Sequence, residues 1–142
     1  MLLVETELRP SRIHGIGVYL LEDVKEGQLI WRFDSRIDRV FADAELDQVP
    51  ERLRTFLTTY STYHEQSGLW VLCGDHGRHF NHSDEPNTLS MGVAFGDDIA
   101  AAHLPAGTEL TTDYNLICDA IRTRGAPYLG KGNGGSRVSA LS

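Results

Sequence analysis

Lysine is scarce in this sequence, and acidic residues outnumber basic ones. Lys25 and Lys131 are the two lysines among 13 basic residues, against 20 acidic residues, and the formal net charge is −7. A non-specific nucleic-acid binder needs a basic face to neutralise phosphates, so this charge argues against that class of partner. It suits attraction of a basic protein or peptide, although solubility alone also explains an acidic chain.

Cysteine is scarce as well. Cys73 and Cys118 are each flanked by apolar residues, so we expect small buried side chains in a reducing compartment and no disulfide framework. Because there is no Cys-x-x-Cys cluster, a thiolate zinc site is not expected.

Long apolar runs are absent. The longest, such as Gly17–Leu21 and Ile99–Ala102, fall far short of the ~20 residues that a membrane-spanning helix needs. Met1–Leu8 has no basic segment ahead of a long apolar run, which predicts no signal peptide. We therefore expect no membrane partner and a cytoplasmic protein, or a nuclear one in a eukaryote.

The chain has 142 residues and 41% hydrophobic content, which fits one compact domain. Two connectors, Val24–Ile30 and Leu104–Leu110, each place a glycine midway between two apolar residues, as in a tight turn between strands. Short runs punctuated by glycine predict a mainly β fold. The candidate strands are Leu2–Leu8, Gly17–Leu21, Gln28–Phe33, Leu69–Cys73, Leu89–Phe95, Ile99–Ala102 and Glu109–Thr112.

The middle of the chain has helical periodicity. Pro50 is well placed for a first helical turn, and Asp43–Asp47 fits a shorter helix before it. We therefore expect a small helical insert over about 42–66 in a domain spanning 1–115, followed by a flanking segment, 116–142, with a flexible glycine-rich tail. The apolar residues at helical spacing are Leu53, Phe56, Leu57, Tyr60 and Tyr63.

Three polar motifs carry the candidate chemistry. In Ser11–Tyr19, two glycines one residue apart open a strand and let the backbone approach a ligand, although such a pair is more often only a turn. Gly77–Asn87 places polar residues between two apolar strands, where they need hydrogen bonds or a ligand. Gly107–Asn115 sets Tyr114 just beyond a strand, where it offers a phenol to a pocket or serves as a half-buried structural tyrosine.

The second motif admits other interpretations, including an ordinary polar loop. Asn81-His82-Ser83 is a glycosylation sequon, but a chain without a secretory signal does not meet the modifying enzyme. His76, His79 and His82 lie three residues apart and suggest a metal site. On a strand such positions face opposite sides, and the Gly, Asn and Pro content disfavours a helix, so we expect no metal.

Together the motifs resemble those of SET-domain protein lysine methyltransferases. That family shows Ser-x-x-x-Gly-x-Gly, then Arg-Phe-x-Asn-His-Ser-x-x-Pro-Asn, then Gly-x-Glu-Leu-Thr-x-Asp-Tyr. The resemblance covers about residues 9 to 115 and implies a β-clip fold of short curved sheets with a C-terminal pseudoknot, a topology rare in proteins. The matching residues, in the same order, are Ser11…Gly15-Ile16-Gly17, Arg78-His79-Phe80-Asn81-His82-Ser83…Pro86-Asn87 and Gly107…Glu109-Leu110-Thr111-Thr112-Asp113-Tyr114.

The resemblance further implies transfer of a methyl group from S-adenosylmethionine to a lysine side chain of a protein. Tyr114 would be the catalytic residue, and the insert would help to select the substrate. The substrate channel would be lined by Phe33, Phe80 and Thr112. The cofactor-binding residues would be Gly15, Ile16, Gly17, Tyr19, Arg78, Asn81, His82 and Tyr114.

An ordinary phenol, with a pKa of about 10, is mostly protonated at neutral pH, so we expect Tyr114 to position the reactants and not to act as a base. Thr112 stands where the family is usually aromatic, and Phe33 lies near a frequent tyrosine. A smaller, less polar channel predicts that a methylated amine can react again, giving di- or trimethyl-lysine.

Cys118 alone follows the third motif, so the three-cysteine zinc segment of many relatives is not expected. Residues 116–128, or a second copy in a homodimer, would close the pocket instead. Two rival functions remain: a peptide- or ligand-binding module with the same fold but no catalysis, and a metalloprotein built on His76, His79 and His82.

Overall fold

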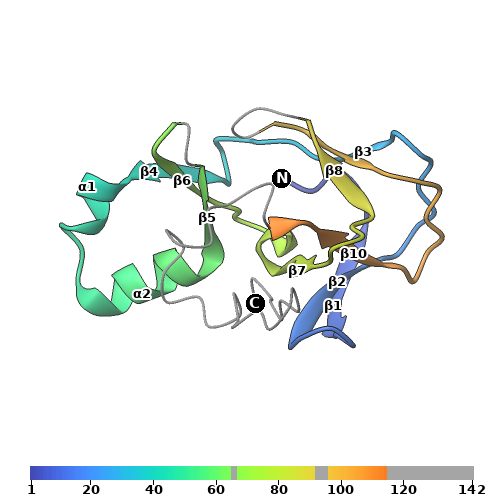
Figure 1. The fold of residues 1–142 in the computed structure, drawn as a ribbon, viewed down its shortest axis with the longest axis horizontal. Coiled ribbons are helices and arrows are strands. Elements are labelled where there is room, and N and C mark those ends of the chain that lie inside the picture. Colours follow the sequence, from blue (N-terminus) through green and yellow to red (C-terminus); the bar gives the residue numbers. More distant parts are fainter. Residues whose placement is uncertain (65–66, 92–95, 115–142) are drawn as a thin grey trace.

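The computed structural model of the chain describes residues 1–64, 67–91 and 96–114, which form small sheets and short helices (Figure 1). One sheet has the order β1 (Thr6–Pro10), β2 (Ile16–Leu20), β10 (Glu109–Thr112), β7 (Asn81–His82). A second has the order β3 (Leu29–Trp31), β9 (Asp98–Ala100), β8 (Thr88–Ser90), and a third β4 (Arg39–Ala42), β6 (Leu69–Leu72), β5 (Ser61–His64). The predicted mainly β fold is confirmed.

The helical insert lies with the third sheet at one end of the molecule (Figure 1). It contains α1 (Asp43–Leu46) and α2 (Glu51–Tyr60), and a 3-10 turn, η1 (His76–His79), follows β6. The insert is joined to the third sheet by a hydrogen bond of 2.8 Å, which the indole of Trp70 on β6 donates to the carboxylate of Asp43 on α1. None of the described helices is long and apolar enough to cross a membrane.

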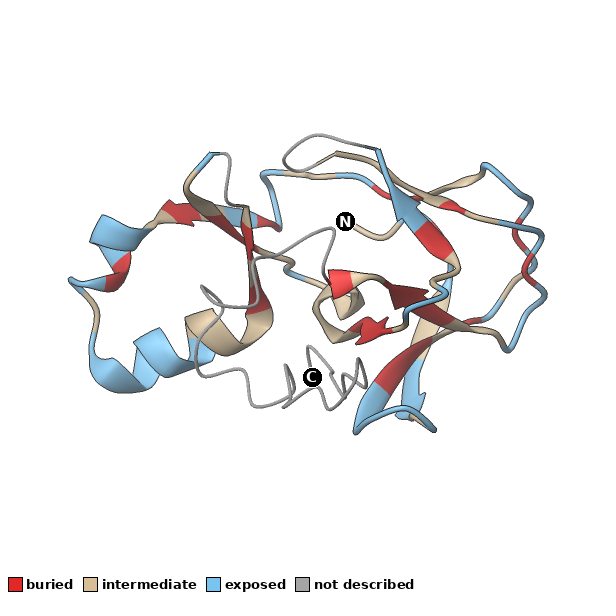
Figure 2. Ribbon diagram, viewed as in Figure 1, coloured by how far each residue is buried: buried red, intermediate tan, exposed pale blue. Residues whose placement is uncertain are grey.

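The helix ends earlier than its periodicity predicts. Tyr63 continues the helical spacing, but Ser61–His64 is strand β5, in which Tyr63 pairs with Trp70 of β6 and both rings are buried. Burying an aromatic pair across two strands outweighs the local spacing. Helix α2 itself buries no residue fully and leaves Leu53 and Phe56 exposed (Figure 2).

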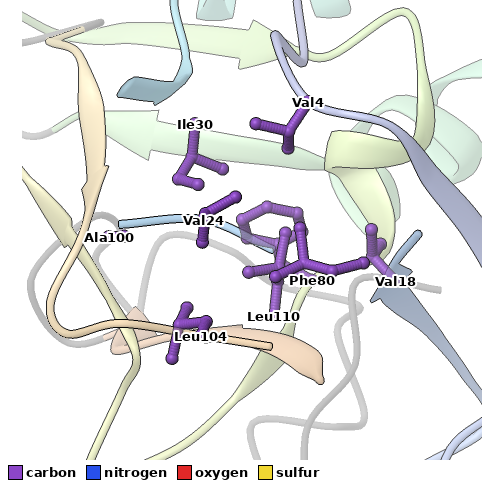
Figure 3. Close-up of a cluster of buried hydrophobic side chains, with 9 residues drawn as sticks. Val4, Val18, Val24, Ile30, Phe80, Ala100, Leu104 and Leu110 are labelled. Atoms are coloured by element: carbon purple, nitrogen blue, oxygen red, sulfur yellow. The ribbon is translucent and has the colours of Figure 1, made fainter. Parts of the chain in front are cut away.

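The main core gathers apolar side chains from distant parts of the chain (Figure 3). Alternation along β2 turns Val18 and Leu20 inward, and Leu110 of β10 is buried beside them. The same alternation leaves Gly17, Tyr19 and Glu109 on the opposite face of the sheet. The buried cluster consists of Val4, Val18, Leu20, Val24, Ile30, Phe80, Ala100, Leu104 and Leu110.

The two similar connectors lie against each other. Val24 and Leu104 form an antiparallel bridge, with N–H···O distances of 2.8 and 2.9 Å. Both glycines of these connectors, Gly27 and Gly107, have positive φ, as the predicted turns require.

Several strand boundaries differ from the sequence-based ones. The first strand begins at Thr6, because Leu2 instead bridges Trp31. Strands β4, β5 and β7 have no counterpart in the predicted set, and β8 covers Thr88–Ser90. The predicted strand end at 92–95 and the flanking segment 116–142 lie outside the described residues. The domain boundaries therefore stay a prediction.

Candidate functional site

The second and third motifs meet where β7 pairs with β10 in parallel. Asn81 is opposite Thr111, and His82 is opposite Thr112. Strand β10 also pairs with β2, which carries the first motif. Strand β10 therefore lies between β2 and β7, and the site combines residues that are about 65 to 100 positions apart in the sequence.

The amide of Asn81 is completely buried and directed at the first motif. Its Nδ2 group lies 3.1 Å from the carbonyl oxygen of His14 and 3.2 Å from that of Ile16. It also lies 2.9 Å from the hydroxyl of Ser11 and 2.8 Å from the carboxylate of Glu109. Its Oδ1 atom is buried and accepts no hydrogen bond from the described residues. A buried acceptor of this kind calls for a donor from a ligand or a water molecule.

Glu109 is the centre of this arrangement. Its carboxylate accepts hydrogen bonds from Ser11 (2.8 Å), from the phenol of Tyr19 (3.0 Å) and from Asn81. Gly17 lies directly above it: a Cβ atom at this position would be 2.3 Å from the carboxylate Oε2 atom. Glycine is therefore required at position 17 for close approach and not for an unusual backbone angle.

Gly15 has a different role in the same hairpin. Its φ of 51° places it in the left-handed region, and its carbonyl oxygen accepts the Ser11 N–H at 2.7 Å, which closes the turn. Ile16 is 43% exposed, and its backbone carbonyl, not its side chain, contacts Asn81.

Tyr19 and Glu109 line a surface pocket of about 500 Å³ together with Arg9, Arg12, Pro10 and Gly107. Burial raises the pKa of the Tyr19 phenol, and the hydrogen bond to the Glu109 carboxylate raises it further. Tyr19 is therefore held as a neutral donor to Glu109. The guanidinium of Arg9 lies over the Tyr19 ring, 5.0 Å from the ring centroid.

Tyr114 is held by both His82 and Phe80. The backbone N–H of Tyr114 donates to Nδ1 of His82 at 3.1 Å, and Nε2 of His82 lies 2.8 Å from the Asp84 carboxylate. These contacts fit the neutral tautomer with its proton on Nε2. The phenol donates to the backbone carbonyl of Phe80, and the whole tyrosine is buried.

Asn87 extends the pairing of β10 past the end of β7. Its Nδ2 group donates to the Glu109 carbonyl, and its Oδ1 accepts from the Thr111 N–H, both at 2.8 Å. The Thr88 hydroxyl donates to the Thr111 carbonyl at 2.7 Å. The end of the second motif thus holds β10 in register beside the site.

The remaining predicted site residues lie elsewhere or act through other atoms. The ring of Phe80 belongs to the main core, so its carbonyl and not its ring reaches Tyr114. The guanidinium of Arg78 lies over the rings of Phe56 and Tyr60 on α2, 5.8 and 5.7 Å from their centroids. Phe33 follows β3 with its ring edge-on to Trp31, and Thr112 is buried opposite His82.

Two residues of the site are absent from the predicted set, Ser11 and Glu109. Both stand in the quoted motifs, and the Gly-x-Glu signal of the third motif marked Glu109. A charged residue at the start of a strand normally faces solvent. Only the pairing of β10 with β2 in three dimensions shows that Glu109 is a hydrogen-bonding centre.

The histidines of the second motif contact different groups. His76 contacts Thr6, His79 lies edge-on to Tyr60, and His82 contacts Asp84. Over residues 1–64, 67–91 and 96–114, no three His, Cys, Asp or Glu side chains converge as metal ligands.

Burial of the Cys73 thiol, near Asp38 and Asp75, raises its pKa far above the ordinary value, which makes it a poor nucleophile.

The chain belongs to the SET-domain family, whose model matches residues 15–115. It is 27% identical over 114 residues to human histone-lysine N-methyltransferase 2D, a match that covers 77% of this chain but only 2% of that protein. Two solved structures share the fold. A Plasmodium falciparum protein described as a candidate histone methyltransferase has 19% identity and a TM-score of 0.54, with 78% of this chain and 93% of that chain covered. The ctPRC2 complex bound to S-adenosylmethionine has 21% identity and a TM-score of 0.59, with 82% and 16% covered.

Proposed function

We propose that the chain transfers a methyl group from S-adenosylmethionine to a lysine side chain of another protein. The observation that carries this proposal is the parallel pairing of β7 with β10. It places Asn81 against the Ser11–Gly17 hairpin and His82 against Tyr114. The name of the human relative supports lysine methylation as the reaction class.

The residues present fit this cofactor. The Oδ1 atom of Asn81 is a buried acceptor without a donor among the described residues, and a ligand with an ammonium group, such as S-adenosylmethionine, supplies one. Asn81, His82 and the backbone of Gly15–Gly17 would hold the cofactor, as the family resemblance implies. Bound there, S-adenosylmethionine supplies an electrophilic methyl group on a positively charged sulfur.

Tyr114 orients the reacting groups in this proposal. Its hydroxyl proton is directed at the carbonyl of Phe80, so the phenol is fixed and is not set up as a base. A lysine amine has a pKa of about 10.4, so reaching the neutral, nucleophilic form at pH 7 costs about 4 to 5 kcal/mol. Desolvation in the channel and a neighbouring positive charge lower that cost. Fixing the geometry contributes more, on the order of 7 to 11 kcal/mol.

The substrate we propose is a basic protein. The net charge of −7 favours encounter with basic segments, and the human relative is named for histone lysine. The apolar surface of α2, where Leu53 and Phe56 are exposed, fits the apolar stems of lysine side chains in a basic segment. A cytoplasmic location stays a prediction.

Calorimetric titration with S-adenosylhomocysteine, followed by incubation with labelled S-adenosylmethionine and a histone mixture, tests the proposal. We expect binding and label on lysine. Tyr114→Phe should keep the dissociation constant for S-adenosylhomocysteine within about threefold and lower the transfer rate at least about tenfold. Ser90→Ala removes a hydroxyl and its hydrogen bond to Asp98, outside the candidate site, and serves as the matched control for the rate.

The outcomes separate the rival functions. Absence of S-adenosylhomocysteine binding by the intact chain would refute the proposal. Binding without transfer to any protein in a histone mixture or a cell lysate would favour a non-catalytic module. Stoichiometric metal in the purified protein would favour the histidine-based metalloprotein.

A further inference from the structure

Glu109 joins the first motif to the second. It accepts hydrogen bonds from Ser11 and Tyr19 on one side and from Asn81 on the other. Gly17 lies against it so closely that no side chain fits between them. The family resemblance assigns no role to this residue, yet every described contact of its carboxylate is with a residue of the candidate site.

Resting on the proposed function, we infer that Glu109 is a positioning residue for the cofactor. It fixes the orientation of the Asn81 amide so that Oδ1 is presented to the ligand, and it holds the Ser11–Gly17 hairpin against β10. Glu109 touches neither reacting atom in this scheme. It acts through Asn81.

The Asn81 side-chain amide can adopt two orientations that differ by a flip about its last bond. The oxygen and nitrogen of an asparagine side chain have nearly the same shape, so only hydrogen-bond partners decide which one faces which way. The Nδ2 side of Asn81 faces the carbonyls of His14 and Ile16 and the Glu109 carboxylate. A flipped amide would put its oxygen against these acceptors, and the negative carboxylate makes that orientation the most costly.

Ser11 adds to the same preference. Its hydroxyl proton points to Glu109, at 2.8 and 3.0 Å from the two carboxylate oxygens, so its lone pairs are left to accept from Asn81 at 2.9 Å. They also accept from the backbone N–H of Ile13 at 2.9 Å, inside the hairpin. Glu109 therefore sets the direction of the Ser11 hydroxyl, and through it both the hairpin and the amide.

Glutamine can replace these hydrogen bonds, whereas alanine cannot. With its oxygen in the place of Oε2, a glutamine at position 109 accepts from Asn81 and Ser11. Its nitrogen then donates to Tyr19, whose own proton can turn to the Pro10 carbonyl, 3.2 Å away. Glu109→Gln is thus the conservative variant, and Glu109→Ala removes the acceptor.

The test is titration of the intact chain with S-adenosylhomocysteine. Glu109→Ala should raise the dissociation constant at least about tenfold, because the amide loses its strongest acceptor, and Glu109→Gln should stay within about threefold of the wild type. Asp43→Ala, which deletes the part-buried hydrogen bond to Trp70 in the insert, is the control and should stay within about twofold. A dissociation constant for Glu109→Ala within twofold of the wild type, or for Glu109→Gln as high as for Glu109→Ala, would overturn the inference.

A second measurement needs no ligand. The two side-chain amide protons of Asn81 should give sharp, slowly exchanging NMR signals in the wild type and in Glu109→Gln. In Glu109→Ala we expect these signals to broaden or shift, while Asp43→Ala leaves them in place. If the wild type does not bind S-adenosylhomocysteine, the proposed function fails, and these signals alone decide whether Glu109 orients the amide. Unchanged Asn81 signals in Glu109→Ala would overturn that part as well.

Discussion

Replacing Gly17 with alanine tests the packing of the site most directly. The added Cβ would lie 2.3 Å from Oε2 and 2.7 Å from Cδ of Glu109, and 3.2 Å from Cβ of Ser11. Real Cβ contacts essentially never fall below 3.0 Å, so the carboxylate must retreat by at least 0.7 Å. A long surface side chain would move at little cost, but this one is bound to Ser11, Tyr19 and Asn81.

The cost follows from the bonds that the movement stretches. A shift of this size lengthens the hydrogen bonds from Ser11 and Asn81, now both 2.8 Å, beyond an effective distance. A hydrogen bond to a charged group contributes about 1.5 to 3 kcal/mol, and overpacking itself costs about 1 to 3 kcal/mol. We therefore expect Gly17→Ala to lower the free energy of unfolding by at least about 2.5 kcal/mol and the melting temperature by at least roughly 8 °C.

Urea denaturation followed by circular dichroism measures this loss, and a double-mutant cycle identifies its cause. In the Glu109→Ala background the clash is gone, so Gly17→Ala should cost less than about 1 kcal/mol there. Gly27→Ala is the control: no atom lies within 4 Å of its added Cβ, but its φ of +79° imposes about 1 to 2 kcal/mol of backbone strain in either background. Additive effects of Gly17→Ala and Glu109→Ala would refute the reasoning.

Three further predictions concern other parts of the chain. Burial raises the pKa of Asp98 to about 6. Because the folded state then binds the carboxyl proton more tightly than the unfolded state does, protonated Asp98 stabilises the fold. This contribution is complete below about pH 4 and is lost as the pH rises through 6. Asp98→Asn should therefore flatten urea-measured stability between pH 4 and 6, by at most about 3 kcal/mol. If Thr112 lines the predicted substrate channel, Thr112→Tyr should narrow it and shift the product toward monomethyl-lysine. Mass spectrometry after exhaustive turnover by the wild type that shows only monomethyl-lysine would contradict this prediction. Arg78→Gln removes the cation from the rings of Phe56 and Tyr60, so amide hydrogen exchange in α2 should quicken a fewfold, with no such change in β2.

The fold was predictable from the sequence where burial alternates along a strand. The short apolar run Gly17–Leu21, opened by a glycine, located β2, and in the structure Val18 and Leu20 are buried with Tyr19 between them on the other face. The same kind of reasoning was wrong at the end of α2, where Tyr63 keeps helical spacing but pairs with Trp70 across two strands. A contact with a residue seven positions later in the chain is outside what a local period can indicate.

Strand β7 shows a second limit. It has two residues, Asn81 and His82, both polar and both buried, so neither its length nor its composition predicts a strand. It exists because the Thr111–Thr112 segment of β10 pairs with it. The polar composition of Gly77–Asn87 and the motif resemblance both pointed to this segment, but neither identified Thr111 and Thr112 as its pairing partners.

Glu109 could not be identified as a partner of Asn81 from the sequence for a related reason. A glutamate after a turn glycine is usually solvated, and its partners Ser11 and Tyr19 lie 98 and 90 residues away. The structure also assigns different atoms to residues that the motif did identify. Phe80 contributes its carbonyl to Tyr114, whereas its ring fills the core.

The pleat of β10 divides the site into two parts that can be perturbed separately. Glu109 and Thr111 face the side of Asn81, the hairpin and the pocket, whereas Leu110 faces the core and Thr112 lies opposite His82. Contacts on the first face bear on the ligand acceptor, and contacts on the second bear on the setting of Tyr114. If the proposed function is right, substitution of Glu109 on the first face should change mainly the cofactor dissociation constant, and substitution of Tyr114 should change mainly the transfer rate.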